Sequence, residues 1–170
     1  LTVLWTPPPE VRETTEIGRY LGWLERERGL TFAGYDELWR WSVDDLAGFW
    51  SSIWEFFEVK SHAPYSTVLV SETMPGATWF AGTRLNFAEH LMGRDDEAGQ
   101  VAIVSHSQTR DPSELSFADF REQVARARAG LVRLGVGPGD RVVAYLPNIP
   151  ETLVAFAATA SLGAVWASCA

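Results

Sequence analysis

The sequence contains a single cysteine, Cys169, among its 170 residues. One thiol excludes an internal disulfide framework and suits a reducing compartment such as the cytosol. Basic residues are also scarce, because 14 lysines and arginines against 22 aspartates and glutamates leave a net charge of −8. This balance, without any run of lysine or arginine, argues against a nucleic-acid partner.

Long apolar runs are absent as well. The longest mostly apolar stretch, residues 152–160, is too short to span a bilayer. The opening residues, LTVLWTPPPE, lack the basic region and apolar core of a secretory signal peptide. Hydrophobic residues make up 46% of the chain and charged residues 21%, which is typical of a globular protein. The sequence therefore predicts a soluble cytoplasmic protein with no membrane partner.

The first part of the chain has helical periodicity. Pro9 can open a helix that runs to about Arg28, because proline suits the first helical turn and apolar residues then recur at i, i+3, i+4 and i+7. A second helix is predicted over 35–41. The following residues, Ser42-Val43-Asp44-Asp45, are typical of an N-terminal cap and predict that Ser42 opens a third helix.

Tryptophan is abundant in this helical layer. Five of the eight tryptophans lie within residues 23–54. Helical spacing turns most of these rings toward a core, which favours packing inside the protein. Exposed tryptophan also favours interfaces, so a Trp-rich helical module that binds a protein partner is an alternative function.

The middle of the chain carries weaker signals. Residues 59–83 contain prolines and a Pro-Gly turn, and we predict an irregular stretch there. Asn86, with Glu89 three residues later, predicts the N-terminal cap of a short helix through Met92. The charged segment 93–99 is predicted to be a mobile loop.

After residue 100 the pattern changes to short apolar runs and amphipathic stretches. Strands are predicted at 101–104 and 114–117, and Ser116 with Asp119 caps the helix that follows. One face of that helix is predicted to be apolar, formed by Phe120, Val124, Ala127, Leu131 and Leu134.

The end of the chain predicts a strand–helix–strand unit. Residues 142–146 read as a buried strand, Asn148 as the cap of the next helix, and 164–168 as a second, parallel strand. The helix between them is apolar on nearly every side and therefore needs cover on more than one face. The predicted fold class is α/β, with an N-terminal helical cap over 1–99 and the incomplete beginning of an α/β domain over 100–170.

Candidate chemical groups are few. The glycine-rich run 135–140 follows a helix and precedes a strand, which is the reverse of a phosphate-binding loop, so it predicts a connection. His62, His90 and His106 lie far apart and lack the spacing of metal ligands. Cys169 falls in an apolar strand and is predicted to be a core residue. We therefore predict no catalytic, cofactor-binding or metal-binding residue in this sequence.

Three stretches resemble one family. YDELWRWSVDDLAGFWSSIWEFF, at 35–57, resembles the N-terminal cap of the short-chain acyl-CoA synthetases. ATWFAGTRLNFAEHLM, at 77–92, resembles their Trp-Phe…Leu-Asn signature. Residues 115–169 resemble the start of the adenylate-forming domain that acyl-CoA synthetases share with luciferases and peptide-synthetase adenylation domains. The runs DELWRW, LNFAEHL and AYLPNIPE favour the acetoacetate-activating members, with acetyl- and propionyl-CoA synthetases as the alternative.

The resemblance implies a parent enzyme that joins acetoacetate to ATP, releases diphosphate, and passes the acyl group from AMP to coenzyme A, with Mg²⁺ at the phosphates. The family motifs that carry this chemistry are missing from the sequence, so we expect an inactive N-terminal fragment. Strand ends near Leu146 and Ala170 are expected to border the missing site. We also expect the isolated chain to self-associate through its exposed strand edge.

Overall fold

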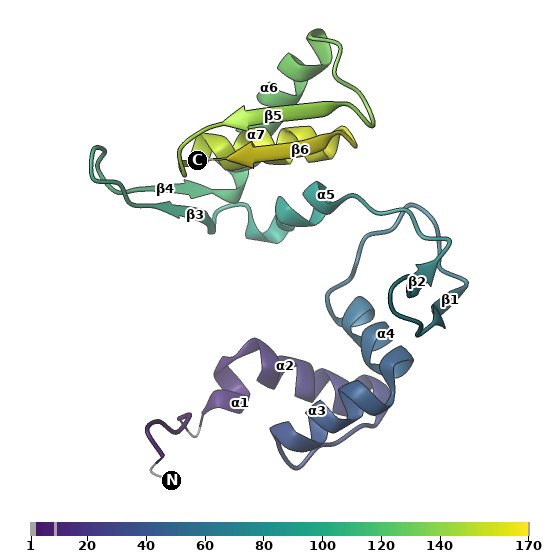
Figure 1. Ribbon diagram of the computed structural model, residues 1–170. Helices are drawn as coiled ribbons and strands as arrows, with labels where there is room; N and C mark the ends of the chain where they lie inside the picture. Colours follow the sequence, from purple (N-terminus) through teal and green to yellow (C-terminus); the bar gives the residue numbers. More distant parts are fainter. Residues whose placement is uncertain (1–2, 9, 170) are drawn as a thin grey trace. The chain divides into compact units, whose positions relative to one another are not determined.

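The computed structural model describes residues 3–8 and 10–169, and its chain divides into two compact units (Figure 1). Helices dominate the first unit, whereas strands and helices alternate in the second, so the predicted α/β class is confirmed. The predicted domain boundary between residues 99 and 100 stays a prediction. Unit 1 consists of residues 1–59 and 63–83, and unit 2 consists of residues 60–62 and 84–170.

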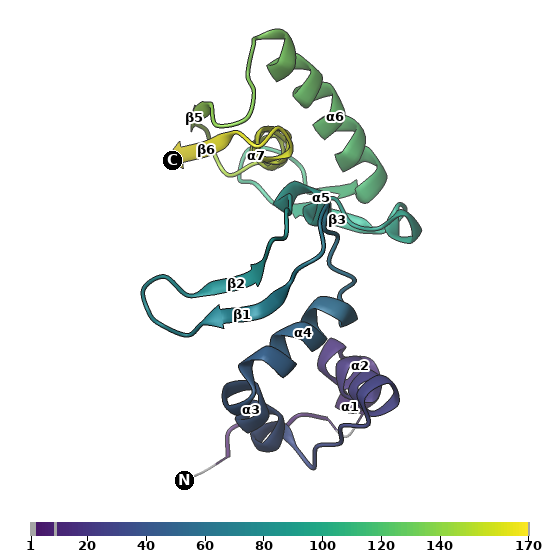
Figure 2. The same cartoon turned by 90° about the vertical axis from the view of Figure 1, so that its right-hand side faces the viewer.

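Unit 1 contains the predicted helices and, in addition, an antiparallel hairpin (Figure 2). The hairpin contradicts the prediction that 59–83 is irregular. The Val-Leu-Val run of its first strand pairs its backbone groups with the second strand, and the Pro-Gly turn marks only the bend between them. The elements are α1 (Val11–Thr14), α2 (Glu16–Trp23), the π-helical turn η1 (Leu24–Arg28), α3 (Tyr35–Asp44), α4 (Leu46–Phe56), β1 (Thr67–Ser71) and β2 (Thr78–Ala81).

The first predicted helix is divided at Thr15. The backbone of Thr15 is extended, and its Oγ1 accepts a hydrogen bond from the Gly18 amide at 3.2 Å, which caps α2. The apolar periodicity predicted one continuous helix, but Thr15 can cap a new helix and therefore separates α1 from α2. Gly29, with φ +64°, ends the helical stretch where the sequence places its end. Pro9, predicted to open it, lies outside the described residues.

Asp45 rather than Ser42 caps α4. Ser42 lies inside α3, where its hydroxyl donates to the Trp39 carbonyl at 2.7 Å. The Asp45 carboxylate accepts from the Gly48 amide at 2.9 Å and satisfies one free donor of the helix start. The helix was therefore predicted correctly and its cap wrongly, because a serine inside a helix can bond to its own preceding turn.

The core of unit 1 is largely aromatic. Tyr20, Leu24 and Leu38 are buried at its centre. Trp54 packs on Phe80 of the hairpin, with 4.4 Å between ring centroids. Of the five tryptophans within 23–54, Trp23, Trp41 and Trp54 are partly buried, whereas two, Trp39 and Trp50, are exposed, so the predicted packing toward a core holds for three of the five. The partly buried side chains around the centre are Leu21, Trp23, Leu30, Phe32, Trp41, Phe49, Ile53 and Phe56.

The hydrogen bond between Tyr20 and Ser52 is buried in this core, and mutation can measure its contribution to the unfolding free energy. The Tyr20 hydroxyl lies 2.5 Å from Ser52 Oγ, and that serine donates to the Phe49 carbonyl at 2.6 Å. Tyr20 is therefore the donor to Ser52. Ser52→Ala leaves the buried tyrosine hydroxyl without its partner, and we expect a loss of about 1–3 kcal/mol in unfolding free energy. Tyr20→Phe is expected to cost less, about 1 kcal/mol, because Ser52 keeps its own acceptor.

The same tyrosine predicts alkaline sensitivity. Burial raises the pKa of Tyr20 above its usual value of 10.0, although Ser52 and Arg28 lower it in part. A raised pKa gives stability that is present below pH of about 10 and is lost as the pH rises through the folded value. Urea unfolding between about pH 8 and 11 should show this loss of stability in the unsubstituted chain and not in the Tyr20→Phe variant. Tyr35→Phe, an exposed control, should leave the loss unchanged.

Unit 2 contains two separate two-stranded sheets and three α-helices in its described part. β3 pairs with β4 antiparallel, and β5 pairs with β6 in parallel, as predicted for the strand–helix–strand unit. No described helix in the chain has both the length and the apolar character needed to cross a membrane. The elements are α5 (Phe87–Leu91), the 3₁₀ turn η2 (Asp95–Glu97), β3 (Val101–Ser105), β4 (Ser113–Ser116), α6 (Phe117–Arg133), β5 (Arg141–Tyr145), α7 (Pro150–Ser161) and β6 (Val165–Cys169).

The core of unit 2 lies between α6 and α7. Phe120 and Val124 of α6 pack against Val154, Ala157 and Ala158 of α7. α5 and β6 also contact α7, so the predicted cover on more than one face is confirmed. Leu134, predicted to share the apolar face of α6, is instead 81% exposed. It follows the last residue of the helix, and the helical spacing no longer applies there.

The predicted burial of the parallel strands is wrong. Val143 and Tyr145 of β5 are 77% and 81% exposed, whereas Ala144 between them is buried. Cys169 at the end of β6, predicted to lie in a core, is also exposed. Side chains alternate across a strand, so a two-stranded sheet with a helix on one face leaves every second residue in solvent. The exposed apolar face supports the expected self-association of the isolated chain, which stays a prediction that light scattering can test.

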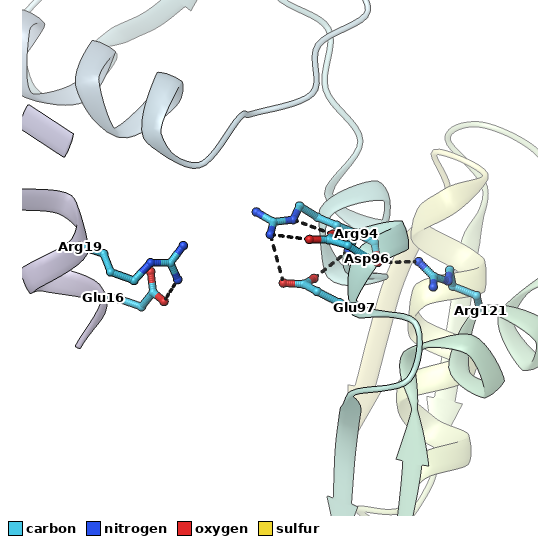
Figure 3. A network of polar contacts seen from close by, with 6 residues as sticks. All are labelled: Glu16, Arg19, Arg94, Asp96, Glu97 and Arg121. Atoms are coloured by element: carbon cyan, nitrogen blue, oxygen red, sulfur yellow. Dashed lines mark hydrogen bonds and ion pairs between the residues drawn. The ribbon is translucent and has the colours of Figure 1, made fainter. Parts of the chain in front are cut away.

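The charged segment before β3 packs against the start of α6 (Figure 3). Arg94 lies 3.1 Å from Asp96, and Arg121 of α6 donates to the Arg94 carbonyl at 3.2 Å. Arg121 also pairs with Asp95 at 3.5 Å. These ion pairs are largely exposed and individually weak, although their shared arginines tie the turn to one helix. The mobility predicted for 93–99 stays a prediction.

Candidate ligand-binding edge of the parallel strands

The two parallel strands end side by side at one edge of their sheet. Tyr145 stands opposite Cys169 in the register, and the Leu146 amide donates to the Cys169 carbonyl at 3.3 Å. Open α/β sheets bind ligands beyond the carboxyl ends of their strands, so this edge is the candidate site. Ala170, predicted to border the site, lies outside the described residues.

The loop after β5 leads directly into α7. Ile149 is the N-cap residue, with an extended backbone and no side-chain capping bond. Asn148, predicted to cap the helix, lies one position too early. Proline has no N–H and favours the first helical position, so Pro150 starts the helix immediately after Ile149. Thr152 Oγ1 donates to the Pro147 carbonyl at 2.7 Å and holds the loop against the helix.

The N-terminus of α7, where the helix dipole is positive, carries a carboxylate in its first turn, that of Glu151. Glu151 accepts a hydrogen bond from its own backbone amide and pairs with Arg110 at 3.0 Å. Both interactions hold the pKa of Glu151 below its usual value, and the backbone bond has the larger effect. A helix N-terminus that already carries a paired carboxylate has a weakened attraction for an external anion.

A small cavity of about 140 Å³ lies beside this edge. Its polar lining residues are Ser105 and His106 at the end of β3 and Asn148 in the loop before α7. Two predicted positions, His106 and Asn148, are thus brought together by the tertiary structure. The side chains of these three residues can hydrogen-bond a small polar ligand, but the lining holds no lysine or arginine to neutralise phosphate. The remaining lining residues are Ile103, Val104, Ile149, Pro150 and Leu153.

A larger cavity of about 320 Å³ lies within unit 1, among α2, α3 and α4. Its lining is mainly aromatic and aliphatic, including Tyr20, Leu38 and Phe56, and it contains no basic side chain. Such a pocket lacks the cationic groups that nucleotide phosphates require. Three of the rings that line it, Tyr35, Trp39 and Phe57, are exposed.

The remaining histidines lie together near α5. His62 is 3.0 Å from Glu89, and His90 accepts a hydrogen bond from the Lys60 amide. Within residues 3–8 and 10–169, no group of three or more His, Cys, Asp or Glu side chains could hold a metal ion. Sequence reasoning missed the Glu151–Arg110 pair, since the two residues lie 41 positions apart and nothing local links them.

Comparison with known proteins supports the family resemblance that the sequence motifs indicate, and the matches include residues of both units. Residues 35–91 match the family "Acetyl-coenzyme A synthetase N-terminus", and residues 94–169 match the family "AMP-binding enzyme". A solved acetoacetyl-CoA synthetase from Streptomyces lividans is 42% identical, with a TM-score of 0.90 over 99% of this chain and 26% of its own. The chain belongs to the AMP-binding acyl-CoA synthetases.

Relatives in the acyl-CoA synthetase family are named for more than one acyl group. The acetoacetyl-coenzyme A synthetase of Rhizobium meliloti is 35% identical over 166 residues, which is 98% of this chain and 25% of that protein. The malonamoyl-CoA synthetase of Penicillium aethiopicum is 32% identical over 162 residues, which is 91% of this chain and 22% of that protein. The chain thus spans about a quarter of the length of the curated relatives that it matches.

Proposed function

We propose that this chain is the N-terminal portion of an ATP-dependent acetoacetate–CoA ligase. The observation that carries the proposal is the likeness to the Streptomyces acetoacetyl-CoA synthetase, which extends over nearly the whole chain at 42% identity. The match of residues 35–91 to an acetyl-coenzyme A synthetase N-terminus supports the position within the parent.

The proposed reaction has two steps. A carboxylate oxygen of acetoacetate attacks the α-phosphorus of ATP, a new P–O bond forms, and diphosphate leaves. The sulfur of coenzyme A then attacks the carbonyl carbon of the acyl-adenylate, AMP leaves, and the thiol proton passes to solvent. Mg²⁺, when bound, would neutralise charge on the phosphates. We assign it no residue of this chain, because its described residues hold no suitable group of ligands.

The contribution of this chain is proposed to be structural. The edge formed by the ends of β5 and β6 supplies a wall of the ligand site, and Thr152 holds the loop beside it. The start of α7 is weakened as a phosphate site by Glu151. We therefore propose that the chain is inactive by itself and depends on residues supplied elsewhere in the parent.

Acetoacetate is the proposed substrate, and acetate or propionate is the alternative. The malonamoyl-CoA synthetase relative shares this stretch at 32% identity although it is named for a different acyl group. A stretch common to such enzymes supports the reaction class more strongly than the acid. The choice of acid is therefore proposed to depend on side chains outside this chain.

Carboxylate-dependent ATP–diphosphate exchange tests the proposal. The full-length parent should exchange label at least about tenfold faster with acetoacetate than with acetate or propionate, the discrimination that one well-placed polar contact can supply. The isolated 170-residue chain should show no exchange. Faster exchange with acetate or propionate would assign the parent to the alternative substrates. No exchange with any of these acids would contradict the ligase proposal, and exchange by the isolated chain would contradict its inactivity.

A further inference from the structure

The cavity of about 320 Å³ among α2, α3 and α4 (Figure 2) is large enough for a small molecule. Ligand sites span about 300–1,000 Å³ and are walled mainly by apolar and aromatic side chains, with a few polar groups that select the ligand. This cavity, which we call the aromatic cavity, fits that description. Six of its lining residues are aromatic: Tyr20, Tyr35, Trp39, Phe49, Phe56 and Phe57.

The rings bound the aromatic cavity on different sides. The ring planes of Tyr20 and Phe49 are inclined at 86°, and those of Phe56 and Phe57 at 79°. Tyr20 is 6% exposed and forms part of the floor, whereas Trp39 is 53% exposed and lies at the mouth. Because the face of an aromatic ring is electronegative, rings on several sides of one space attract a cation placed among them.

The charge around the aromatic cavity is negative. Its described lining contains no lysine or arginine, and the carboxylate in that lining is Glu16. Glu16 pairs with Arg19, but both side chains are more than half exposed, and such a pair is weak enough to yield to a bound cation. Unit 1 carries 12 of the 22 acidic residues and 5 of the 14 lysines and arginines, a net charge of −7. The surrounding potential therefore favours a positive ligand.

Two hydroxyl groups of the lining have already donated their hydrogens. Tyr20 donates to Ser52 at 2.5 Å, and Ser42 donates to the Trp39 carbonyl at 2.7 Å. Each hydroxyl oxygen can still accept a hydrogen bond. These two groups therefore offer acceptor atoms to a ligand, which suits a positively charged or N–H-bearing molecule better than an anion.

We propose that the aromatic cavity binds a compact organic cation, of the class of quaternary ammonium ions with a short apolar chain. The methyl groups of such an ion present its charge through an apolar surface, which suits contact with ring faces. Glu16 supplies the opposite charge. A ligand that bears a phosphate or a carboxylate is disfavoured, because none of the described lining residues is cationic. The cavity belongs to unit 1 and the ends of β5 and β6 to unit 2, so binding of the cation does not depend on the proposed ligase reaction.

Calorimetric titration of the full-length protein with choline tests the proposal. Neohexanol is the matched neutral probe, because a carbon atom takes the place of the choline nitrogen in the same molecular shape. Choline should bind saturably and about five- to thirtyfold more tightly than neohexanol, the discrimination that a partly desolvated aromatic cage supplies. Equal affinity for the two probes would overturn the proposal, and so would the absence of saturable choline binding.

Three variants locate the cation. Trp39→Leu keeps an apolar side chain but removes one ring face, so choline affinity should fall about two- to fivefold while neohexanol affinity changes by less than about twofold. Glu16→Gln removes the carboxylate charge and should lower choline affinity about two- to fivefold, with a smaller effect at high salt. Trp5→Leu, at a tryptophan that is 74% exposed and outside the lining, should leave both affinities unchanged. Choline affinity that is unaltered in both Trp39→Leu and Glu16→Gln would place the cation elsewhere and overturn the proposal.

Discussion

Replacing Leu24 with alanine is expected to lower the unfolding free energy of unit 1 by about 2–5 kcal/mol. Leu24 is 0% exposed and lies at the centre of the core with Tyr20 and Leu38. Truncation removes the transfer free energy of its side chain and leaves a cavity that the surrounding aromatic rings can fill only in part. Tryptophan fluorescence during urea unfolding reports this unit, because seven of the eight tryptophans belong to it.

Leu134→Ala is the matched control. The sequence places this leucine on the apolar face of a helix, whereas the structure leaves it 81% exposed. Its truncation is expected to change stability by no more than about 0.5 kcal/mol. For Leu134→Ala, the stability change is measured from amide exchange in α6, because Leu134 belongs to unit 2. Similar losses at Leu24 and Leu134 would contradict the burial assigned to both.

Gly93→Ala is expected to destabilise the contact between the charged segment and α6 by about 2–5 kcal/mol. Gly93 has φ +69°, where a side chain costs about 1–2 kcal/mol. An added Cβ would also lie 2.6 Å from the ring of Phe117, and relieving such an overlap costs about 1–3 kcal/mol. The slowest-exchanging amides of α6 should lose protection accordingly.

Two variants separate the steric cost at Gly93 from the conformational cost. Gly135→Ala has a similar φ of +86° with nothing within 4 Å of the added Cβ, so only the conformational cost of about 1–2 kcal/mol is expected. Adding Phe117→Ala to Gly93→Ala removes the overlap, and the coupling between the two changes should be favourable. Additive effects of the two substitutions would show that Gly93 and Phe117 do not meet.

Local signals predicted those elements whose cap and periodicity agree. Asn86 caps α5 and Ser116 caps α6 where the sequence places them, because each side chain bonds to an amide two or three residues ahead. The cap predicted at Ser42 was wrong by three positions, and the cap predicted at Asn148 was wrong by one. In both places a second residue, Asp45 or Pro150, could start the helix equally well.

The candidate site could be predicted only in outline. Parallel pairing of the last two strands, and hence a common edge at their carboxyl ends, follows from the strand–helix–strand order. Which side chains meet there does not. His106 and Asn148 line one cavity, and Arg110 reaches Glu151, through contacts between residues about 40 positions apart. No local pattern carries such information.

The sequence by itself determined the α/β class, the positions of most helices, and a resemblance to the acyl-CoA synthetases. These depend on hydrophobic period, caps and short motifs, which act over a few residues. Only the tertiary structure decided which apolar residues are buried. It left Val143, Tyr145 and Cys169 in solvent and placed Leu24 at the centre of a core. Burial depends on what packs against each face, and the packing partners lie far away in the sequence.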